Sequence, residues 1–210
     1  MSRIAVIGSG ISGLVCARDL MLLGHEVVVF EKSRSLGGRC ATRKWRDHIV
    51  DHGAQYFTAS TETFLKEIRD LLGDNLCILD GSVVDELGNV IQATAGVRYY
   101  NRQGNNRTGS ALARDLNVQR EVLVESIERG EGPTWKVCDD YFDAVVLTAP
   151  WPQTAKLLGE SSVAPEFVPC LTAFFEYTGK WAGQSQDQYA VSIRDSSALH
   201  YGVLLLWTTL

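Results

Sequence analysis

Four residues near the start of the chain have the types and spacing of a phosphate-binding turn. Gly8, Gly10 and Gly13 form the pattern Gly-x-Gly-x-x-Gly, and Glu31 follows them at the end of a second apolar run. The first glycine permits a tight turn, the second lets a phosphate approach the backbone, and the third allows close helix packing. An acid at the fourth position accepts hydrogen bonds from ribose hydroxyls. The pattern therefore indicates a dinucleotide with a free 2′-hydroxyl, such as FAD or NAD, in preference to NADP.

The segments around this turn are the elements that such a site requires. Residues 3–7 are an apolar run typical of a buried strand, and residues 14–23 carry apolar side chains at helical spacing. Glu26–Glu31 is a second apolar run that predicts another strand. The N-terminus of the helix offers free N–H groups and a partial positive charge, so Ile11 and Ser12 join the expected cofactor contacts. The alternative interpretation is a glycine turn in an α/β protein that binds nothing.

A second glycine-rich loop follows the acid. The run Leu36-Gly37-Gly38-Arg39 would pass a flexible backbone over the same pyrophosphate and supply a guanidinium that forks onto phosphate oxygens. Lys32, next to the acid, is included among the expected cofactor contacts. The alternative is a solvated basic loop with a glycine turn. A position directly behind a dinucleotide motif favours the phosphate contact.

These motifs together resemble the flavin-containing amine oxidase superfamily. The resemblance rests on residues 8–13, on Glu31 and on the Gly-Gly-Arg loop at 36–39. The later run at 51–58, Asp-His-Gly-Ala-Gln-Tyr-Phe-Thr, resembles the renalase-like branch of FAD-dependent oxidoreductases. The run at 143–150, which ends in Thr-Ala-Pro, is similar to a strand of the FAD domain in that branch.

The resemblance covers residues 1–200 and implies FAD as the cofactor, with specific contacts. The residues that would hold the pyrophosphate are Gly8, Gly10, Gly13, Gly38 and Arg39. Glu31 would hold the adenosine ribose, and Val122 would pair its backbone with the adenine edge. Thr148 and Pro150 would lie on the adenosine side of the cofactor.

The implied chemistry is carried by the flavin, so no catalytic side chain is assigned. A substrate C–H next to nitrogen would lose hydride to flavin N5, and O2 would then accept the electrons. Gln55 and Tyr56 are expected near the isoalloxazine ring, although Tyr56 could equally be a core residue of a strand. Asp51 and His52 could act as acid and base, but a turn residue and a polar contact are favoured. Trp151 could stack on a flat substrate or pack in the core.

Composition excludes several classes of function. The 210 residues are 45% hydrophobic and 21% charged with a net charge of -5, so no basic surface favours nucleic acid or an anionic membrane. No apolar run reaches the ~20 residues of a membrane span, and the chain enters its first strand without a signal peptide. Five scattered cysteines without a Cys-x-x-Cys pair favour a reducing compartment, hence the cytoplasm. The histidines and cysteines lack metal-ligand spacing, so no metal is expected.

Beyond the first sixty residues the pattern predicts alternating helices and short strands. A helix over Glu62–Leu72 is expected to begin with a Ser60 cap and to end at Gly73. The other predicted helices are Gly109–Leu116 and Pro152–Leu158. Residues 40–51 are predicted to be extended, with Asp47 at a turn, and residues 76–91 to form two or three short strands broken at 80–81 and 88–89. Five further strands are predicted, at Glu121–Arg129, 135–138, Phe142–Leu147, 170–177 and Tyr189–Ile193. Pro165 and Pro169 bound a predicted linker.

This order predicts an α/β fold with an inserted layer. A Rossmann-like FAD/NAD(P)-binding domain would comprise residues 1–75 and 100–162. An antiparallel-sheet substrate domain would comprise residues 76–99 and 163–210. The partner implied is a small molecule, an amine or a dihydronicotinamide-type reductant; the oligomeric state is not specified by the sequence.

The fold is expected to be incomplete at its C-terminus. Members of the resembled family are longer and carry a Gly-Asp motif near their end that holds the ribityl-pyrophosphate part of FAD. Gly73-Asp74, the only such pair here, follows a surface helix and has the wrong context. Residues 201–210 form an uncharged apolar run that looks like a core strand cut off.

Three functional interpretations follow. The first is an FAD-dependent oxidoreductase that is renalase-like. The second is a shortened, inactive form that binds only a nucleotide or a partner protein. The third is an NAD-binding protein without flavin, against which the loop at 37–39 argues.

Overall fold

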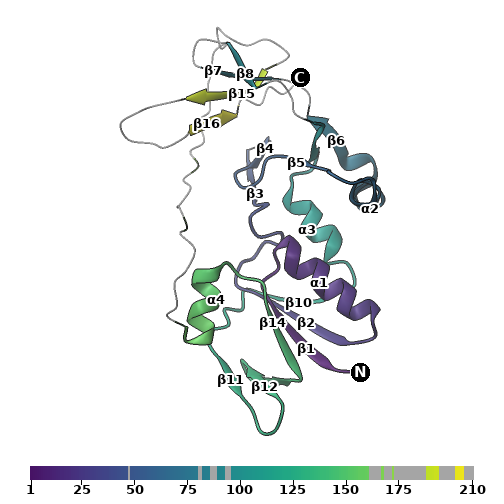
Figure 1. Ribbon diagram of the computed structural model, residues 1–210, viewed down its shortest axis with the longest axis vertical. Helices are drawn as coiled ribbons and strands as arrows, with labels where there is room; N and C mark the ends of the chain where they lie inside the picture. Colours follow the sequence, from purple (N-terminus) through teal and green to yellow (C-terminus); the bar gives the residue numbers. More distant parts are fainter. Residues whose placement is uncertain are drawn as a thin grey trace.

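A four-stranded parallel sheet with the strand order β10-β2-β1-β14 lies at the lower end of the molecule in Figure 1. The computed structural model describes residues 1–46, 48–79, 82–85, 89–92, 96–160, 167, 172, 188–193 and 202–205. The strands of this sheet are β1 (Arg3–Ile7), β2 (Glu26–Glu31), β10 (Asn117–Arg120) and β14 (Ala144–Leu147). The apolar runs predicted at 3–7 and 26–31 therefore form the two inner strands, where both faces are covered.

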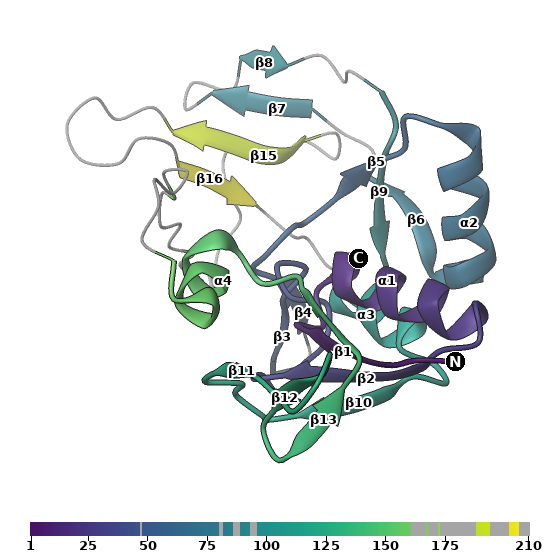
Figure 2. The same cartoon turned by 60° about the horizontal axis from the view of Figure 1, so that its bottom comes forward.

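Helix α1 (Ile11–Leu22) packs on one face of this sheet (Figures 1 and 2). Val6, Val29 and Ala17 are completely buried where the strands and the helix meet. The helix begins directly after Gly10, earlier than the apolar spacing at 14–23 predicts. The strand-turn-helix-strand unit predicted from the sequence is thus confirmed as a Rossmann-like α/β core.

The opposite face is covered by an antiparallel three-stranded meander. Its strands are β11 (Ile127–Arg129), β12 (Trp135–Val137) and β13 (Asp140–Phe142). Val137 and Phe142 from the meander pack against Val28 and Phe30 of the parallel sheet. The Phe142 and Phe30 rings meet edge to face, with centroids 5.8 Å apart.

Two predicted strands around this meander are wrong in their extent. Of the predicted strand Glu121–Arg129 only Ile127–Arg129 forms a strand, and its predicted first residue, Glu121, has a φ of 62°, which a strand does not allow. The predicted strand Phe142–Leu147 is divided at Asp143, whose carboxylate accepts a hydrogen bond from the Arg3 N–H at 2.7 Å.

The helix predictions differ in accuracy. Helix α2 (Glu62–Leu72) is confirmed, but its cap is Thr61, whose hydroxyl accepts from the Phe64 N–H at 3.2 Å, and not Ser60. Helix α3 (Asn106–Leu112) begins three residues and ends four residues earlier than the predicted helix over 109–116, so the prediction is wrong at both ends. Helix α4 (Trp151–Leu158) carries Pro152 in its first turn, and it ends at Gly159 in the left-handed region.

Short sheets complete the fold. The hairpin of β3 (Thr42–Trp45) and β4 (His48–Asp51) confirms the extended prediction at 40–51; Asp47 lies outside the described residues. The strands β5 (Phe57–Thr58), β9 (Arg98–Asn101) and β6 (Leu76–Leu79) form a sheet beside α2, and the short helix η1 (Gly73–Asn75) leads into β6. A further sheet has the order β16-β15-β7-β8, from strands Gly202–Leu205, Gln188–Ile193, Ser82–Asp85 and Val90–Gln92.

This last sheet lies at the end of the molecule opposite the parallel sheet in both views (Figures 1 and 2). The strands predicted in 76–91 and at 189–193 are confirmed, and part of the apolar run 201–210 pairs as β16 with β15. The predicted strand at 170–177, the linker between Pro165 and Pro169, and the breaks at 80–81 and Gly88 lie outside the described residues, apart from Phe167 and Thr172. No helix among the described residues is long and apolar enough to cross a bilayer.

Candidate dinucleotide-binding site

The three glycines of the turn after β1 are required for three different reasons. Gly8 has a φ of 108°, a left-handed conformation, and a Cβ there would lie 2.8 Å from the Thr148 hydroxyl oxygen. A Cβ on Gly13 would lie 2.1 Å from the Gly8 carbonyl oxygen, so only glycine lets α1 approach β1 this closely. A Cβ on Gly10, in contrast, would meet no heavy atom within 4 Å. Gly8 and Gly13 are explained by internal packing, whereas Gly10 faces open space.

Thr148, which follows β14, hydrogen-bonds to the backbone of the glycine turn. Its hydroxyl oxygen lies 3.0 Å from the carbonyl oxygen of Ile7 and 3.2 Å from that of Gly8. Its backbone N–H also donates to the Ile7 carbonyl, at 3.0 Å. The hydroxyl proton is therefore directed at the backbone of the glycine turn.

The Glu31 carboxylate is held by hydrogen bonds from Ser9 of the glycine turn and from Ser33. The side chain is only 8% exposed, and its Oε2 accepts from the Ser9 N–H at 2.8 Å and from the Ser9 hydroxyl at 2.7 Å. Its Oε1 accepts from the Ser33 N–H at 2.7 Å. Burial by itself raises the pKa of Glu31, but the hydrogen bonds from Ser9 and Ser33 outweigh burial and bring the pKa below its ordinary value. Glu31 is therefore a carboxylate at neutral pH.

The Gly-Gly loop lies directly against the glycine turn. Gly37 forms an isolated parallel bridge with Gly10, and its N–H donates to the Ser9 carbonyl at 2.9 Å. A Cβ on Gly38 would lie 2.9 Å from the Gly10 Cα. Lys32 and Arg39, the cations expected here, are both exposed on this loop. The two predicted phosphate loops are thus brought together around Gly10.

Helix α3 holds the Gly-Gly loop from behind. A Cβ on Gly109 of α3 would lie 2.6 Å from both the Cα and the N of Gly37. Sequence reasoning missed this helix contact. The signal present in the sequence was a glycine inside a helical segment, which a close backbone approach explains.

A buried polar network anchors α3 and the neighbouring strands. Asp51 accepts hydrogen bonds from the Thr42 hydroxyl and, at 2.9 Å, from the Asn105 N–H. The Asn105 side chain donates to the Ala54 carbonyl at 2.9 Å and accepts from the Asn101 N–H at 2.8 Å. Burial raises the pKa of Asp51 above its ordinary value, despite these hydrogen bonds. Asp51 is the last residue of β4 and not a turn residue, and an acid-base role would have to compete with these hydrogen bonds.

Val122 is the residue expected near the adenine, and Gln55 and Tyr56 are those expected near the isoalloxazine ring. The Val122 N–H donates to the Glu31 carbonyl at 3.0 Å, so a backbone pairing with adenine would use the Val122 carbonyl. Gln55 is half-buried, and Tyr56 is 36% exposed with the Arg98 guanidinium 5.2 Å from its ring centroid. Phe57, the neighbour of Tyr56, stacks on Tyr99.

The start of α4 carries a buried donor. The Pro150 carbonyl accepts from the backbone N–H groups of Gln153 and Thr154. The indole Nε1 of Trp151 is buried and has no hydrogen-bond partner among the described residues. At the N-terminus of α1, Ile11 is half-buried and Ser12 is exposed.

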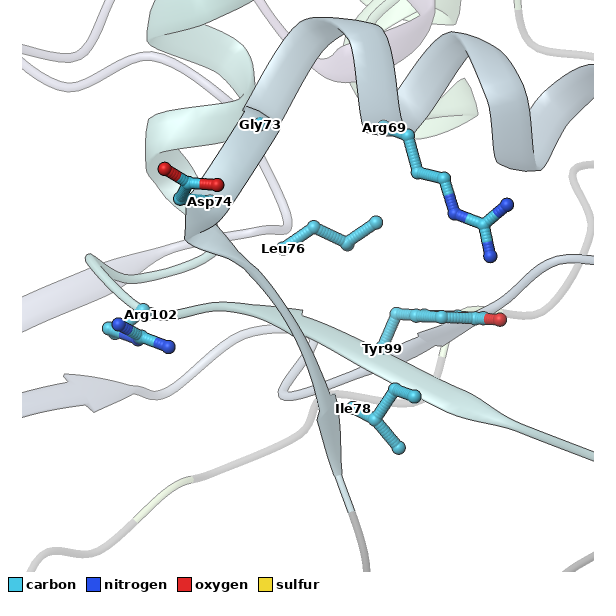
Figure 3. A pocket seen from close by; sticks show the side chains of 7 residues that line it. All are labelled: Arg69, Gly73, Asp74, Leu76, Ile78, Tyr99 and Arg102. Carbon is cyan, nitrogen blue, oxygen red and sulfur yellow. The ribbon is translucent and has the colours of Figure 1, made fainter.

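A separate hollow of about 650 Å³ lies between the end of α2 and the β6–β9 strands (Figure 3). Figure 3 shows the Arg69 and Arg102 guanidinium groups on opposite sides of it, with Leu76 and Tyr99 between them. The Arg102 Nε lies 3.3 Å from the Cys77 sulfur. None of the lining residues belongs to the glycine turn or the Gly-Gly loop. Among the described residues, no group of three histidine, cysteine or acidic side chains could hold a metal ion.

Part of the chain that contains the glycine turn matches a known domain family. Residues 6–73 match the NAD(P)-binding Rossmann-like domain. The match runs from within β1 to the end of α2, and it includes both glycine loops and Glu31.

Two curated relatives are named for flavin chemistry. The chain is 52% identical over 47 residues to flavin-containing monooxygenase FMO GS-OX-like 4 of Arabidopsis thaliana, which is 22% of this chain and 10% of that protein. It is 51% identical over 43 residues to the flavin-dependent L-tryptophan oxidase RebO of Lentzea aerocolonigenes, which is 20% of this chain and 9% of that protein. The matched segments span about a tenth of each relative's length.

A solved structure shares the fold over more of the chain. The crystal structure of a fatty acid isomerase from P. acnes that produces CLA superimposes with a TM-score of 0.60 at 16% identity. The superposition covers 77% of this chain and 62% of that chain. At this identity the likeness concerns the fold.

Proposed function

We propose that the chain binds FAD at the glycine turn after β1 and belongs to an FAD-dependent oxidoreductase. The observation that carries the proposal is the open space at Gly10, where a Cβ would meet nothing within 4 Å although Gly8 and Gly13 are tightly packed. A glycine that neither conformation nor packing requires fits a ligand that approaches the backbone. The flavin-containing relatives favour FAD as that ligand.

The residues around this space fit the cofactor. In the proposal, the pyrophosphate contacts Gly8, Gly10, Ile11, Ser12, Gly13, Lys32, Gly38 and Arg39, and the adenosine half contacts Glu31, Val122, Thr148 and Pro150. Glu31 is ionised, and its Oε1, which does not bind Ser9, is the proposed acceptor for a ribose hydroxyl. The exposed guanidinium of Arg39 is able to turn toward a phosphate.

The proposed reaction is the oxidation of a small molecule, an amine or a dihydronicotinamide, in the manner of the renalase-like branch. When bound, the flavin supplies a hydride acceptor for a C–H next to nitrogen, and O2 is the proposed final acceptor. Gln55 and Tyr56 are proposed to line the ring pocket, and no side chain is assigned an acid or base role. We further propose that residues 76–99 and 163–210 belong to the substrate layer, and residues 1–75 and 100–162 to the FAD domain.

A cytoplasmic location is part of the proposal. The described cysteines Cys16, Cys40, Cys77 and Cys138 are free thiols, and the absence of disulfides among them is consistent with a reducing compartment.

A second candidate is an NAD-binding protein without flavin. It is favoured by the family description that residues 6–73 match, which names NAD(P). Both candidates use the same turn and the same acid, so the distinction requires a direct comparison of ligands.

The test is a pair of titrations of the purified chain with FAD and with NAD, followed by calorimetry. The proposal predicts a lower Kd for FAD, and loss of binding in the Gly10→Val variant. This variant should fold, because Gly10 has a φ of −64° and its Cβ position is free. Tighter binding of NAD would support the second candidate, and a folded Gly10→Val protein that still binds FAD would contradict the site.

A further inference from the structure

We propose that Ser9 is a positioning residue that fixes the orientation and the charge of Glu31, and thereby sets the preference for a free ribose 2′-hydroxyl over a 2′-phosphate. The inference rests on the proposed binding of an adenine dinucleotide at this turn. Ser9 lies between Gly8 and Gly10, at a position that the glycine motif leaves open.

The geometry shows that Ser9 binds one oxygen of Glu31 twice. Its N–H and its hydroxyl both donate to Oε2, at 2.8 and 2.7 Å, and Ser9 is 0% exposed. A carboxylate oxygen has two lone-pair sites, so Ser9 fills both sites of Oε2. Oε1 accepts from the Ser33 N–H, at 2.7 Å, and because both Ser9 donors are bonded to Oε2, Oε1 is the oxygen left to a ribose hydroxyl. The serine therefore determines which oxygen faces the ligand.

The same hydrogen bonds keep the carboxylate negative. Burial opposes ionisation of Glu31, and the contacts from Ser9, followed by those from Ser33, more than offset it. A fixed negative acceptor accepts a bond from a hydroxyl but repels a phosphate at the same place. Without the Ser9 hydroxyl, Oε2 would lose one of its two Ser9 donors and keep the Ser9 N–H, on a carboxylate that is 8% exposed. Its proton affinity would then rise and its orientation would be less restricted.

The charges nearby do not replace this contact. Four cationic residues lie near Glu31, and all four side chains are exposed. They are Lys32 and Arg34, which follow Glu31 in sequence, Arg39 of the Gly-Gly loop, and Arg120, which pairs with Glu31 in the register of β10 and β2. Among the described residues, none of them forms an ion pair with Glu31 within 4 Å. Hydrogen bonds from Ser9 and Ser33 therefore set the charge state of this acid.

The experiment compares Ser9→Ala with the control Ser35→Ala, an exposed serine that precedes the Gly-Gly pair in the loop after β2. The probes are ADP-ribose and 2′-phospho-ADP-ribose, titrated by calorimetry between about pH 4 and 8. We expect Ser9→Ala to weaken ADP-ribose about tenfold, within the range for a charge-assisted hydrogen bond, and to reduce the discrimination against the 2′-phosphate. On acidification, the variant should lose ADP-ribose binding at a higher pH than the parent chain. Ser35→Ala should behave like the parent chain in every titration.

A double-mutant cycle with Glu31→Gln separates positioning from a general structural effect. If Ser9 acts through Glu31, Ser9→Ala should add little to the loss already caused by Glu31→Gln. Additive effects, or an unchanged pH profile and discrimination in Ser9→Ala, would overturn the inference. Failure of the parent chain to bind either probe would instead overturn the proposed function.

A measurement on the parent chain covers the case in which Ser9→Ala does not fold. The carboxyl ¹³C shift of Glu31, followed by NMR during acid titration, should give a pKa below the ordinary value of about 4.3. A midpoint at or above that value would show that Ser9 does not hold the acid in its ionised form, and would overturn the inference without any variant.

Discussion

Gly109 of helix α3 lies against Gly37 so closely that a Cβ on Gly109 would be 2.6 Å from the Gly37 nitrogen. Gly37 in turn forms a parallel bridge with Gly10. The helix, the Gly-Gly loop and the glycine turn are therefore stacked backbone on backbone. The shape of the proposed pyrophosphate site depends on this contact as well as on the glycine motif itself.

The first prediction concerns this contact. Gly109→Ala should destabilise the fold by about 1–3 kcal/mol, because backbone atoms of the loop must move to admit the methyl group. The displaced loop should also weaken FAD binding. Urea unfolding and an FAD titration measure the two effects, with Ser110→Ala, an exposed position of the same helix, as the control. An unchanged affinity would mean that the loop does not contact the cofactor.

A second prediction contrasts two glycines of one motif. Gly13→Ala should damage the fold itself, since its Cβ would lie 2.1 Å from the Gly8 carbonyl oxygen. Gly10→Val should leave the melting temperature close to that of the parent chain while it blocks binding. Thermal unfolding of the two variants side by side distinguishes them. Similar destabilisation in both would refute the separation of packing and binding roles.

A third prediction uses the half-buried carboxylate of Asp51. Its pKa is raised in the folded state, so the folded chain holds a proton more tightly than the unfolded chain does. Stability from this group is therefore greatest at low pH and is lost as the pH rises from the unfolded value through the folded value. In Asp51→Asn, which keeps an acceptor oxygen for Thr42 and Asn105, this part of the pH dependence should disappear.

The control for that experiment removes the acceptor altogether. Asp51→Ala leaves the Asn105 N–H and the Thr42 hydroxyl without their acceptor, which should cost about 1–3 kcal/mol at neutral pH. Urea unfolding at several pH values measures both variants. Equal stability of the alanine and asparagine variants would contradict the network as a source of stability.

A fourth prediction concerns the buried indole of Trp151. Trp151→Phe removes an N–H that has no partner among the described residues, so loss of this N–H should not lower the stability of the chain without ligand. If the N–H donates to the bound cofactor, FAD affinity should fall severalfold in the variant. Unfolding without FAD and titration with FAD give the two quantities. An unchanged affinity would remove Trp151 from the cofactor site.

Local signals made the core of this fold predictable from the sequence. The apolar runs of β1 and β2 and the glycines between them specify a strand-turn-helix-strand unit without reference to distant residues. The amphipathic spacing of α2 likewise predicts its range, and only its cap differs, because Thr61 and Ser60 are both suitable residue types.

The misplaced elements depend on contacts across the chain. The start of α3 is set by Asn105, which bonds to Asp51 and Ala54 more than fifty positions away. The strand expected over 121–129 is broken by a left-handed Glu121, after which the Val122 N–H joins the Glu31 carbonyl. The role of Ser9 was missed for the same reason, since its partner Glu31 is adjacent only after β1 and β2 have paired.

The visible absorption spectrum shows whether this chain holds FAD. The purified chain and its Gly10→Val variant are incubated with excess FAD, desalted and scanned. The parent chain should retain the yellow oxidised-flavin band, and the folded variant should not. A folded parent chain that emerges colourless would contradict the proposed binding of FAD.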